Sequence, residues 1–155
     1  TGNAINYRFA TAFGSSNRLR LDLLINDFIF KALKTKNLII YEKHFQRTFI
    51  HVDDIARSFL FAIENYKMMR GNIYNVGSED MNFTKQEIAE KIQKKIDFYL
   101  HYAEIGEDPD KRNYFVSYKK INELGFSTTI SIEEGIDELI KVIDLIDVKS
   151  PFTNV

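Results

Sequence analysis

Arg47, Asp53 and Asp54 are the side chains whose types and spacing could do chemistry at a single place in this chain. A planar guanidinium can hold a phosphate with two hydrogen bonds, and Arg47 precedes a β-branched run, 48–52, that alternates at period two and predicts a strand. Asp53 or Asp54 then offers a carboxylate to the free N–H groups of a helix that begins there. A strand end beside a helix start, with an arginine at its mouth, predicts a site for an anionic ligand.

These side chains also have structural interpretations. Arg47 could instead form a salt bridge to Asp53 or Asp54. A helix N-cap and a first-turn acid explain both aspartates without a metal or acid–base chemistry. His51 alternates outward on the predicted strand and is assigned a structural role. The acidic stretch 104–113 lacks the ligand pattern of a calcium loop, so the sequence predicts no metal site.

Composition excludes several classes of protein. The chain has 155 residues, of which 45% are hydrophobic, and a formal net charge of -1, so nothing indicates a nucleic-acid or membrane surface. The absence of cysteine excludes disulfides and cysteine-based zinc sites or nucleophiles. No apolar run is long enough to cross a bilayer and the N-terminus lacks a signal-peptide pattern, so we expect a cytoplasmic protein.

Alternating strand and helix patterns predict an α/β fold with some parallel pairing. Capping boxes at Thr84 with Glu87 and at Ser131 with Glu134 open two of the helices. The strands are few for a complete doubly wound domain, and the first begins only a few residues in, so we expect the chain to begin inside a larger fold. The expected strands are 5–13, 38–41, 49–52, 73–76 and 98–102, and the expected helices are 21–33, 54–66, 85–92, 118–124 and 132–146.

Several blocks of the sequence resemble the extended short-chain dehydrogenases, the family of nucleotide-sugar epimerases and dehydratases. They occur in the family's order and cover the chain from about Tyr7 to Ile143. The family's glycine-rich NAD turn and its Tyr-x-x-x-Lys pair are absent, and both precede the first block in the family. The chain therefore resembles the C-terminal half of such an enzyme. The matching blocks are Arg8–Gly14, Arg47–Ala56, Tyr74–Gly77, Asp108–Arg112 and the stretch from Lys120 to Phe126.

This resemblance implies an incomplete Rossmann domain: the last strands of a Rossmann-type sheet plus the small C-terminal substrate-binding lobe. We treat residues 1–155 as a single C-terminal fragment. Residues 5–20 and 46–76 would be associated with the sheet. Residues 21–45 and 77–148 would form the substrate lobe.

The resemblance also implies which residues bind the substrate's phosphates. Arg47 matches the family arginine that binds the diphosphate of a nucleotide sugar, and this match favours a ligand over a salt bridge. Arg112 stands where a second arginine is usually found, and an ion pair with Asp108 or Asp110 is an equal alternative.

The resemblance implies roles in substrate or cofactor binding for five further residues. Asn26 and Leu23 lie on the helix that covers the nucleotide base in the family, although many members have proline at the position of Asn26 and Leu23 could be simple core. Thr11 stands where the family often has an asparagine that touches the substrate. Phe9 and Ala10 would lie beside the nicotinamide of NAD, and strand packing explains them equally well.

The implied activity is NAD-dependent epimerisation or dehydration of a nucleotide-diphosphate sugar, with NAD in the complete enzyme. We expect this chain alone to bind no NAD and to be inactive without an N-terminal Rossmann half, on the same chain or supplied separately. The alternatives are a non-catalytic binding or assembly module left by truncation, and a proteolytic piece. Because the strand 5–13 would present an open apolar edge, we also expect a homo-oligomer.

Overall fold

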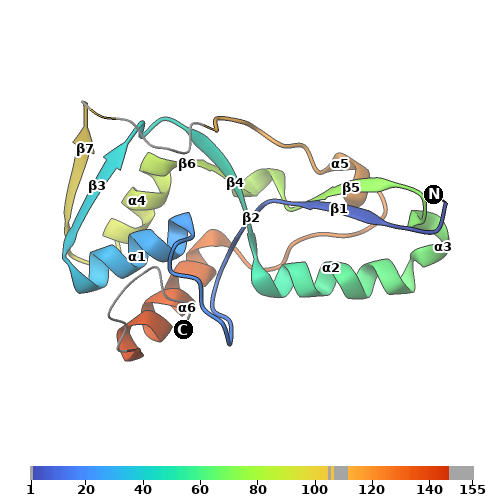
Figure 1. Cartoon of the computed structure of the whole chain (residues 1–155), viewed down its shortest axis with the longest axis horizontal. Helices are drawn as coiled ribbons and strands as arrows, with labels where there is room; N and C mark the ends of the chain where they lie inside the picture. Colours follow the sequence, from blue (N-terminus) through green and yellow to red (C-terminus); the bar gives the residue numbers. More distant parts are fainter. Residues whose placement is uncertain (1, 105, 107–111, 147–155) are drawn as a thin grey trace.

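The computed structural model describes residues 2–104, 106 and 112–146. The molecule is elongated, with β1 and β5 toward one end and β3 and β7 at the other (Figure 1). The strands are β1 (Asn6–Phe9), β2 (Thr11–Phe13), β3 (Asn37–Tyr41), β4 (Gln46–His51), β5 (Ile73–Val76), β6 (Asn82–Thr84) and β7 (Tyr99–Ala103). The helices are α1 (Leu24–Lys34), α2 (Val52–Glu64), α3 (Tyr66–Met69), α4 (Lys85–Gln93), α5 (Lys119–Asn122) and α6 (Ile132–Leu145), with a 3-10 turn, η1 (Glu79–Met81).

Three small sheets confirm the prediction of an α/β fold with parallel pairing. β1 pairs with β5, β2 with β4 and β3 with β7, all parallel, and β6 adds to β4 antiparallel. The sequence predicted one strand over 5–13 and missed β6. The chain changes partner at Ala10, whose N–H donates to the Val76 carbonyl at 3.1 Å, so the predicted strand is divided between two sheets.

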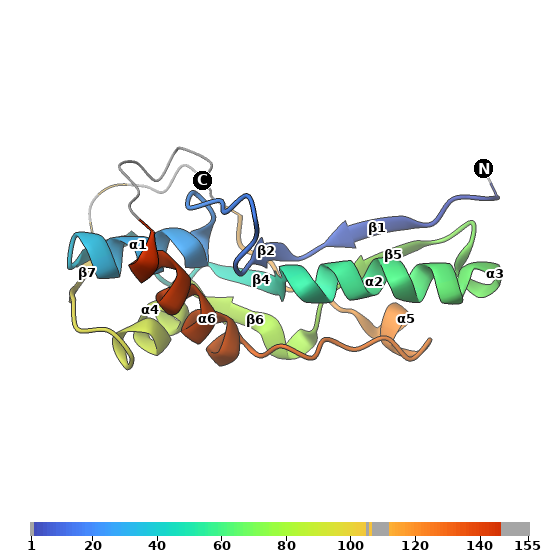
Figure 2. The ribbon, with the colours of Figure 1, turned by 90° about the horizontal axis from the view of Figure 1, so that it is seen from below.

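Two apolar clusters fill the interior. The large core gathers the buried faces of α1, α4 and α6 around β3 and the β2–β4 pair. The small core lies among β1, β5, α3 and α5, and includes Ile50 of β4. Figure 2 shows the two groups of helices at opposite ends of the molecule, with β4 passing between them. β4 therefore belongs to both clusters, and residues 47–51 in it are all buried.

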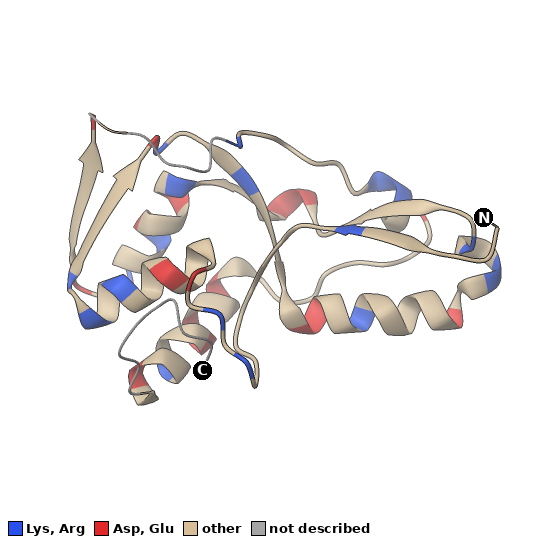
Figure 3. Ribbon diagram, in the orientation of Figure 1, with Lys and Arg blue, Asp and Glu red and all other residues tan. Residues whose placement is uncertain are grey.

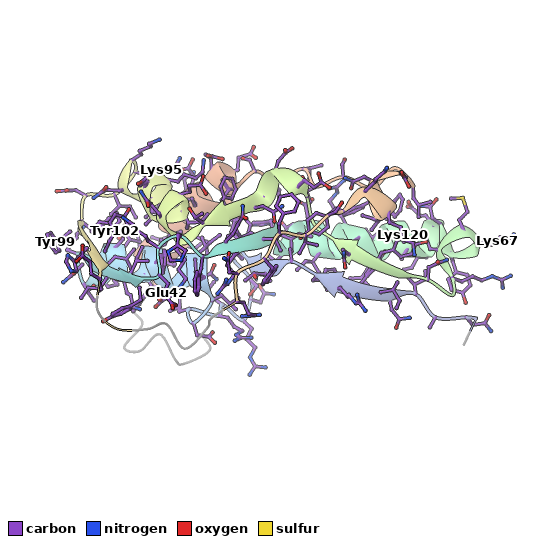
Figure 4. All side chains as sticks on the ribbon, turned by 90° about the horizontal axis from the view of Figure 1, so that it is seen from above. Glu42, Lys67, Lys95, Tyr99, Tyr102 and Lys120 are labelled. Atoms are coloured by element: carbon purple, nitrogen blue, oxygen red, sulfur yellow. The ribbon has the colours of Figure 1, made fainter. Side chains whose placement is uncertain are left out.

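Side chains at the two ends of the molecule fasten short elements to their neighbours. Lys120 of α5 donates to the Ile73 carbonyl at 3.0 Å and lies 4.7 Å from the ring centroid of Tyr74, which ties α5 to β5. Lys95, just after α4, pairs with Asp137 of α6 at 2.6 Å. Figure 4 shows Lys120 and Lys95 far apart along the molecule.

The start of α2 differs from the prediction that Asp53 or Asp54 caps it. His51 is the N-cap, and its Nδ1 accepts the Asp53 N–H at 3.3 Å. Asp54 points inward instead and is fully buried. Its carboxylate accepts the N–H groups of Thr129 and Ile130 at 3.1 Å and also bonds Arg57. Asp54 is therefore the anchor that holds the connection between α5 and α6 against the first turn of α2.

We expect Asp54→Ala to lower the free energy of unfolding by about 2–4 kcal/mol, because two backbone N–H groups and Arg57 would lose a buried, charged acceptor. Urea denaturation followed by circular dichroism measures this change. The adjacent Asp53→Ala is the matched control, since the Asp53 side chain is 70% exposed and its loss should cost less than about 1 kcal/mol. Equal effects of the two substitutions would contradict the anchoring role.

Candidate ligand-binding site

Arg47, Arg112, Thr11 and Leu23, four of the residues assigned to substrate binding from the sequence, line one cavity of about 280 Å³. They come from widely separated parts of the chain. The remaining wall is formed by residues of the segment that leads into and begins α1, namely Asp22, Leu24, Asp27 and Phe28.

Parallel pairing and a short connection create this cavity. Thr11 begins β2, which pairs with β4 so that Thr11 lies opposite Phe49, two residues beyond Arg47. The chain then turns through 14–23 and returns as α1. The first turn of α1 thus comes to lie beside the strands that carry Thr11 and Arg47. Figure 3 shows a short basic segment, in blue, within β4 and an acidic segment, in red, near the beginning of α1.

Arg47 is held in place by backbone and by an aromatic ring. The residue is only 2% exposed, and its Nη1 donates to the Gln46 carbonyl at 3.0 Å. Its guanidinium carbon lies 5.9 Å from the ring centroid of Tyr114, within the range of a cation–π contact. Gln46 also receives the Tyr114 N–H on its carbonyl and gives its own N–H to Asn113 Oδ1. The sequence analysis did not select Tyr114. It lies beside Arg47 because residues 113 and 114 run alongside β4 and bond Gln46.

The salt bridge that the sequence left open for Arg47 is not the arrangement found. Asp54 bonds Arg57, and Asp53 lies on the exposed surface 3.9 Å from His51 Nδ1. Arg112 is exposed at the cavity. Asp108 and Asp110, its alternative partners, lie outside the described residues.

Asn26 is not among the residues that line the cavity. It is 1% exposed, and its amide bonds the Gly14 backbone N–H and carbonyl, each at 3.4 Å, and the Arg20 carbonyl at 2.9 Å. These bonds fasten both ends of the turn after β2 to α1. The placement supports a structural role for Asn26 rather than contact with a ligand.

Phe9 and Ala10, assigned to the nicotinamide, lie where β1 gives way to β2, and neither lines the cavity. The Phe9 ring packs at 5.5 Å from Tyr7 and 5.6 Å from Phe59. β4 passes directly into α2 with His51 as cap and no glycine between them. The β4–α2 junction therefore is not the glycine-rich strand–helix turn that holds a dinucleotide pyrophosphate.

His51 is buried, not turned outward as its place in the alternation suggested. Its Nε2 lies 3.3 Å from Glu138 Oε2, and Glu138 Oε1 accepts the N–H and the hydroxyl of Ser15. A Cβ on Gly14 would lie 2.4 Å from His51 Nε2, so only glycine fits above this imidazole. Because the Ser15 hydroxyl already donates to the carboxylate, the group joins β2, β4 and α6 and does not form a nucleophilic triad.

Asp27 and Phe28 are cavity residues that the sequence analysis did not select. Burial raises the pKa of the Asp27 carboxyl, and the Lys31 ammonium at 2.7 Å opposes that shift. The available signal was the four-residue spacing from Leu23 to Asp27, which places both on one face of a helix. The described residues contain no group of three or more histidine, aspartate or glutamate side chains arranged to hold a metal ion. Among the helices they form, none has the length and apolar character needed to cross a membrane.

Comparison with known proteins agrees with this architecture. Residues 2–77 match the sequence model of the NAD dependent epimerase/dehydratase family. Probable GDP-L-fucose synthase 1 from Oryza sativa subsp. japonica is 28% identical to this chain over 96 residues, which cover 61% of this chain and 28% of the rice protein.

Solved structures share the fold at low sequence identity. UDP-N-acetylglucosamine 4-epimerase from Bacillus cereus superimposes with a TM-score of 0.75 and 23% identity, over 96% of this chain and 48% of that enzyme. UDP-glucuronic acid 4-epimerase from Bacillus cereus, solved with UDP-glucuronic acid and NAD, gives 0.74 and 23%, over 90% of this chain and 45% of that enzyme.

Residues 2–77 thus match the NAD-dependent epimerase/dehydratase family, and the resemblance expected from the sequence is confirmed. The expected fold, an incomplete Rossmann-type domain of that family, is confirmed as well. The chain spans about half the length of these solved structures and about a quarter of the rice protein.

The Glu138 contacts predict a pH dependence of stability. Burial alone would raise the pKa of this carboxyl, but the bonds from Ser15 and the nearby His51 lower it below its usual value. A carboxyl whose pKa is lower in the folded state stabilises the fold above its unfolded pKa of about 4.3 and loses that contribution as pH falls through the folded pKa. We therefore expect Glu138→Gln to lose stability at pH 7 and to be less sensitive than the parent chain to acidification from about pH 5 to pH 3.

Thermal denaturation across this pH range measures the effect. Glu123→Gln is the control for removing one negative charge, because Glu123 is exposed at the end of α5 and lies 3.8 Å from Lys119. Identical acid limbs for the parent chain and Glu138→Gln would show that the contacts among Ser15, Glu138 and His51 do not set the pKa.

Proposed function

We propose that this chain is the nucleotide-sugar-binding portion of an NAD-dependent epimerase or dehydratase. The observation that carries the proposal is the cavity in which Arg47 and Arg112 share the walls with Thr11, Leu23 and Phe28. Two guanidinium groups suit a diphosphate, apolar side chains suit a base, and a hydroxyl suits a sugar. In this proposal the large core is the substrate lobe.

Arg47 is the residue that would hold the diphosphate. A diphosphate carries two negative charges, and a charge-assisted hydrogen bond shielded from water contributes about 1.5–3 kcal/mol. The bond to the Gln46 carbonyl and the Tyr114 ring fix the guanidinium before any ligand arrives, so little side-chain entropy remains to be lost on binding. Arg112 lies at the same cavity from another segment of the chain, and so the two cations can approach one anion from different sides.

The other parts of the reaction would come from outside this chain. NAD would supply hydride transfer in the complete enzyme, and an N-terminal Rossmann half would hold it, on the same chain or as a separate one. The residues present here would bind and orient the substrate: the arginines on the diphosphate, Leu23 on the base and Thr11 near the sugar. Phe9 and Ala10 would meet the nicotinamide only at the boundary with that half. We expect the chain alone to catalyse no turnover.

A second candidate, an assembly module, is favoured by the open face of β1 and α2. Within the described residues β1 pairs only with β5, so its other edge leaves N–H and C=O groups unpaired. Ile63 of α2 is 72% exposed beside Phe59 and Tyr66, and these residues help line an apolar cavity of about 220 Å³. Either an N-terminal half or a second copy of the chain could cover this face.

Substitution of Arg47 tests the binding function. We expect Arg47→Ala to weaken the binding of a nucleoside diphosphate by about ten- to a hundredfold, because each charge-assisted bond contributes about 1.5–3 kcal/mol. Isothermal titration calorimetry with GDP, UDP, CDP, dTDP and their sugars measures this loss, and a hydride-transfer assay with NAD checks for turnover.

Arg57→Ala serves as the matched control, since Arg57 bonds Asp54 and the Thr129 hydroxyl and does not line the cavity. Binding unchanged in Arg47→Ala, or no binding of any nucleotide by a folded chain, would exclude the substrate-binding function and leave the assembly module.

The open face predicts self-association of this chain. We expect light scattering to give a mass above that of the monomer at high protein concentration, and Ile63→Asp to shift it toward the monomer by placing a charge on the apolar face. Leu145→Asp, at an 86% exposed residue at the end of α6, is the control. A monomeric parent chain at high concentration would contradict the prediction.

A further inference from the structure

The wall of the cavity carries two carboxylates, Asp22 and Asp27, that would not bind a diphosphate. Asp27 lies in its wall together with Arg47 and Arg112, and a carboxylate repels phosphate. Lys31 offsets this charge at 2.7 Å, so Asp27 does not cancel the attraction of the two arginines.

Asp27 retains hydrogen-bonding capacity toward the cavity. Its Oδ2 accepts from Lys31, and in the described part of the chain its Oδ1 has no hydrogen-bond partner. The side chain is 22% exposed. Burial raises the pKa of its carboxyl and the Lys31 ammonium opposes that shift; when ionised, the carboxylate is an acceptor only. Asp22, the other carboxylate in the wall, differs because Arg20 bonds both of its oxygens and its side chain is 38% exposed. Asp27 is therefore the available acceptor.

Apolar side chains surround Asp27 on its own helix. Leu23 and Leu24 precede it by four and three residues, so they lie on the same face of the first turn of α1, and Phe28 follows it. A flat aromatic base can pack against such side chains, whereas a ribose gains less from them. The acceptor and the apolar surface together describe a site for the edge and the face of a nucleobase.

We propose that the Asp27 carboxylate accepts hydrogen bonds from the base of the nucleotide, and that this base is guanine. The ligand is then a guanosine diphosphate sugar, and this assignment rests on the nucleotide-sugar function proposed above. Guanine presents two adjacent donors, N1–H and N2–H, which match the two oxygens of one carboxylate. Uracil and thymine present one N–H between two carbonyl oxygens. Cytosine and adenine place a ring-nitrogen acceptor beside their amino group. A carboxylate therefore gains two bonds from guanine and meets a repelling acceptor on each of the others.

The test compares GDP, IDP and UDP by isothermal titration calorimetry on the 155-residue chain. Inosine diphosphate differs from GDP only in lacking the exocyclic N2 amino group. We expect GDP to bind at least about tenfold more tightly than IDP or UDP, because loss of one hydrogen bond to a charged group costs about that factor or more. This comparison needs no variant and is independent of whether any substitution folds.

Asp27→Asn is isosteric and removes the charge. It should reduce the preference of the chain for GDP over UDP to about twofold or less, because GDP loses a charged acceptor and the repulsion of the uracil carbonyl oxygens is relieved. Asp22→Asn is the matched control and should keep the preference, because Asp22 is already bonded by Arg20. Circular dichroism of both variants checks that they fold.

The outcomes separate the two proposals. No binding of any nucleoside diphosphate would remove the proposed function and the base assignment together. Equal binding of GDP, IDP and UDP, or tighter binding of UDP, would overturn the guanine assignment and leave the nucleotide-binding function intact. If Asp27→Asn weakened all three ligands equally, the carboxylate would be holding the ribose hydroxyls, and the guanine assignment would again be wrong.

Discussion

Burying a guanidinium costs free energy unless its donors find acceptors and its charge is matched, and Arg47 is 2% exposed in the middle strand of the β2–β4–β6 sheet. Contacts with the surrounding residues offset part of this cost. The Gln46 carbonyl accepts one of its N–H groups, the Tyr114 ring covers it, and the cavity opens beside it. Its place at the cavity wall lets the same cation meet an anionic ligand.

β4 is the strand that both ends of the molecule share. It contributes to the large core through Phe49 and to the small core through Ile50, and His51 at its end caps α2. Thr48 bonds the Tyr118 hydroxyl, which ties β4 to the chain that leads into α5. A substitution at the β4–α2 junction would therefore disturb the packing of both clusters and the cavity that β4 borders.

Each acidic side chain of the cavity wall is paired with a basic residue close to it in the sequence. Asp22 is neutralised by Arg20 and Asp27 by Lys31, both within their own segment, while the two arginines of the cavity come from β4 and from residue 112. Because the acids have their own cations, the cavity can combine attraction for phosphate with a remaining acceptor. In contrast to the charged cavity, the open face of β1 and α2 is apolar and lies apart from these charges.

The sequence by itself determined the α/β class, the two capping boxes at Thr84 and Ser131, the helices that follow them and the presence of an arginine at the start of a buried strand. These features are local, because periodicity and capping depend on residues three or four positions apart. Only the tertiary structure decided that Asn26 fastens a turn, that Asp54 anchors the chain before α6 and that Asp27 faces the same cavity as Arg47. Those outcomes depend on which distant backbone groups meet each polar side chain, and such meetings are set by how the strands pair and the helices pack, which spacing along the chain does not encode.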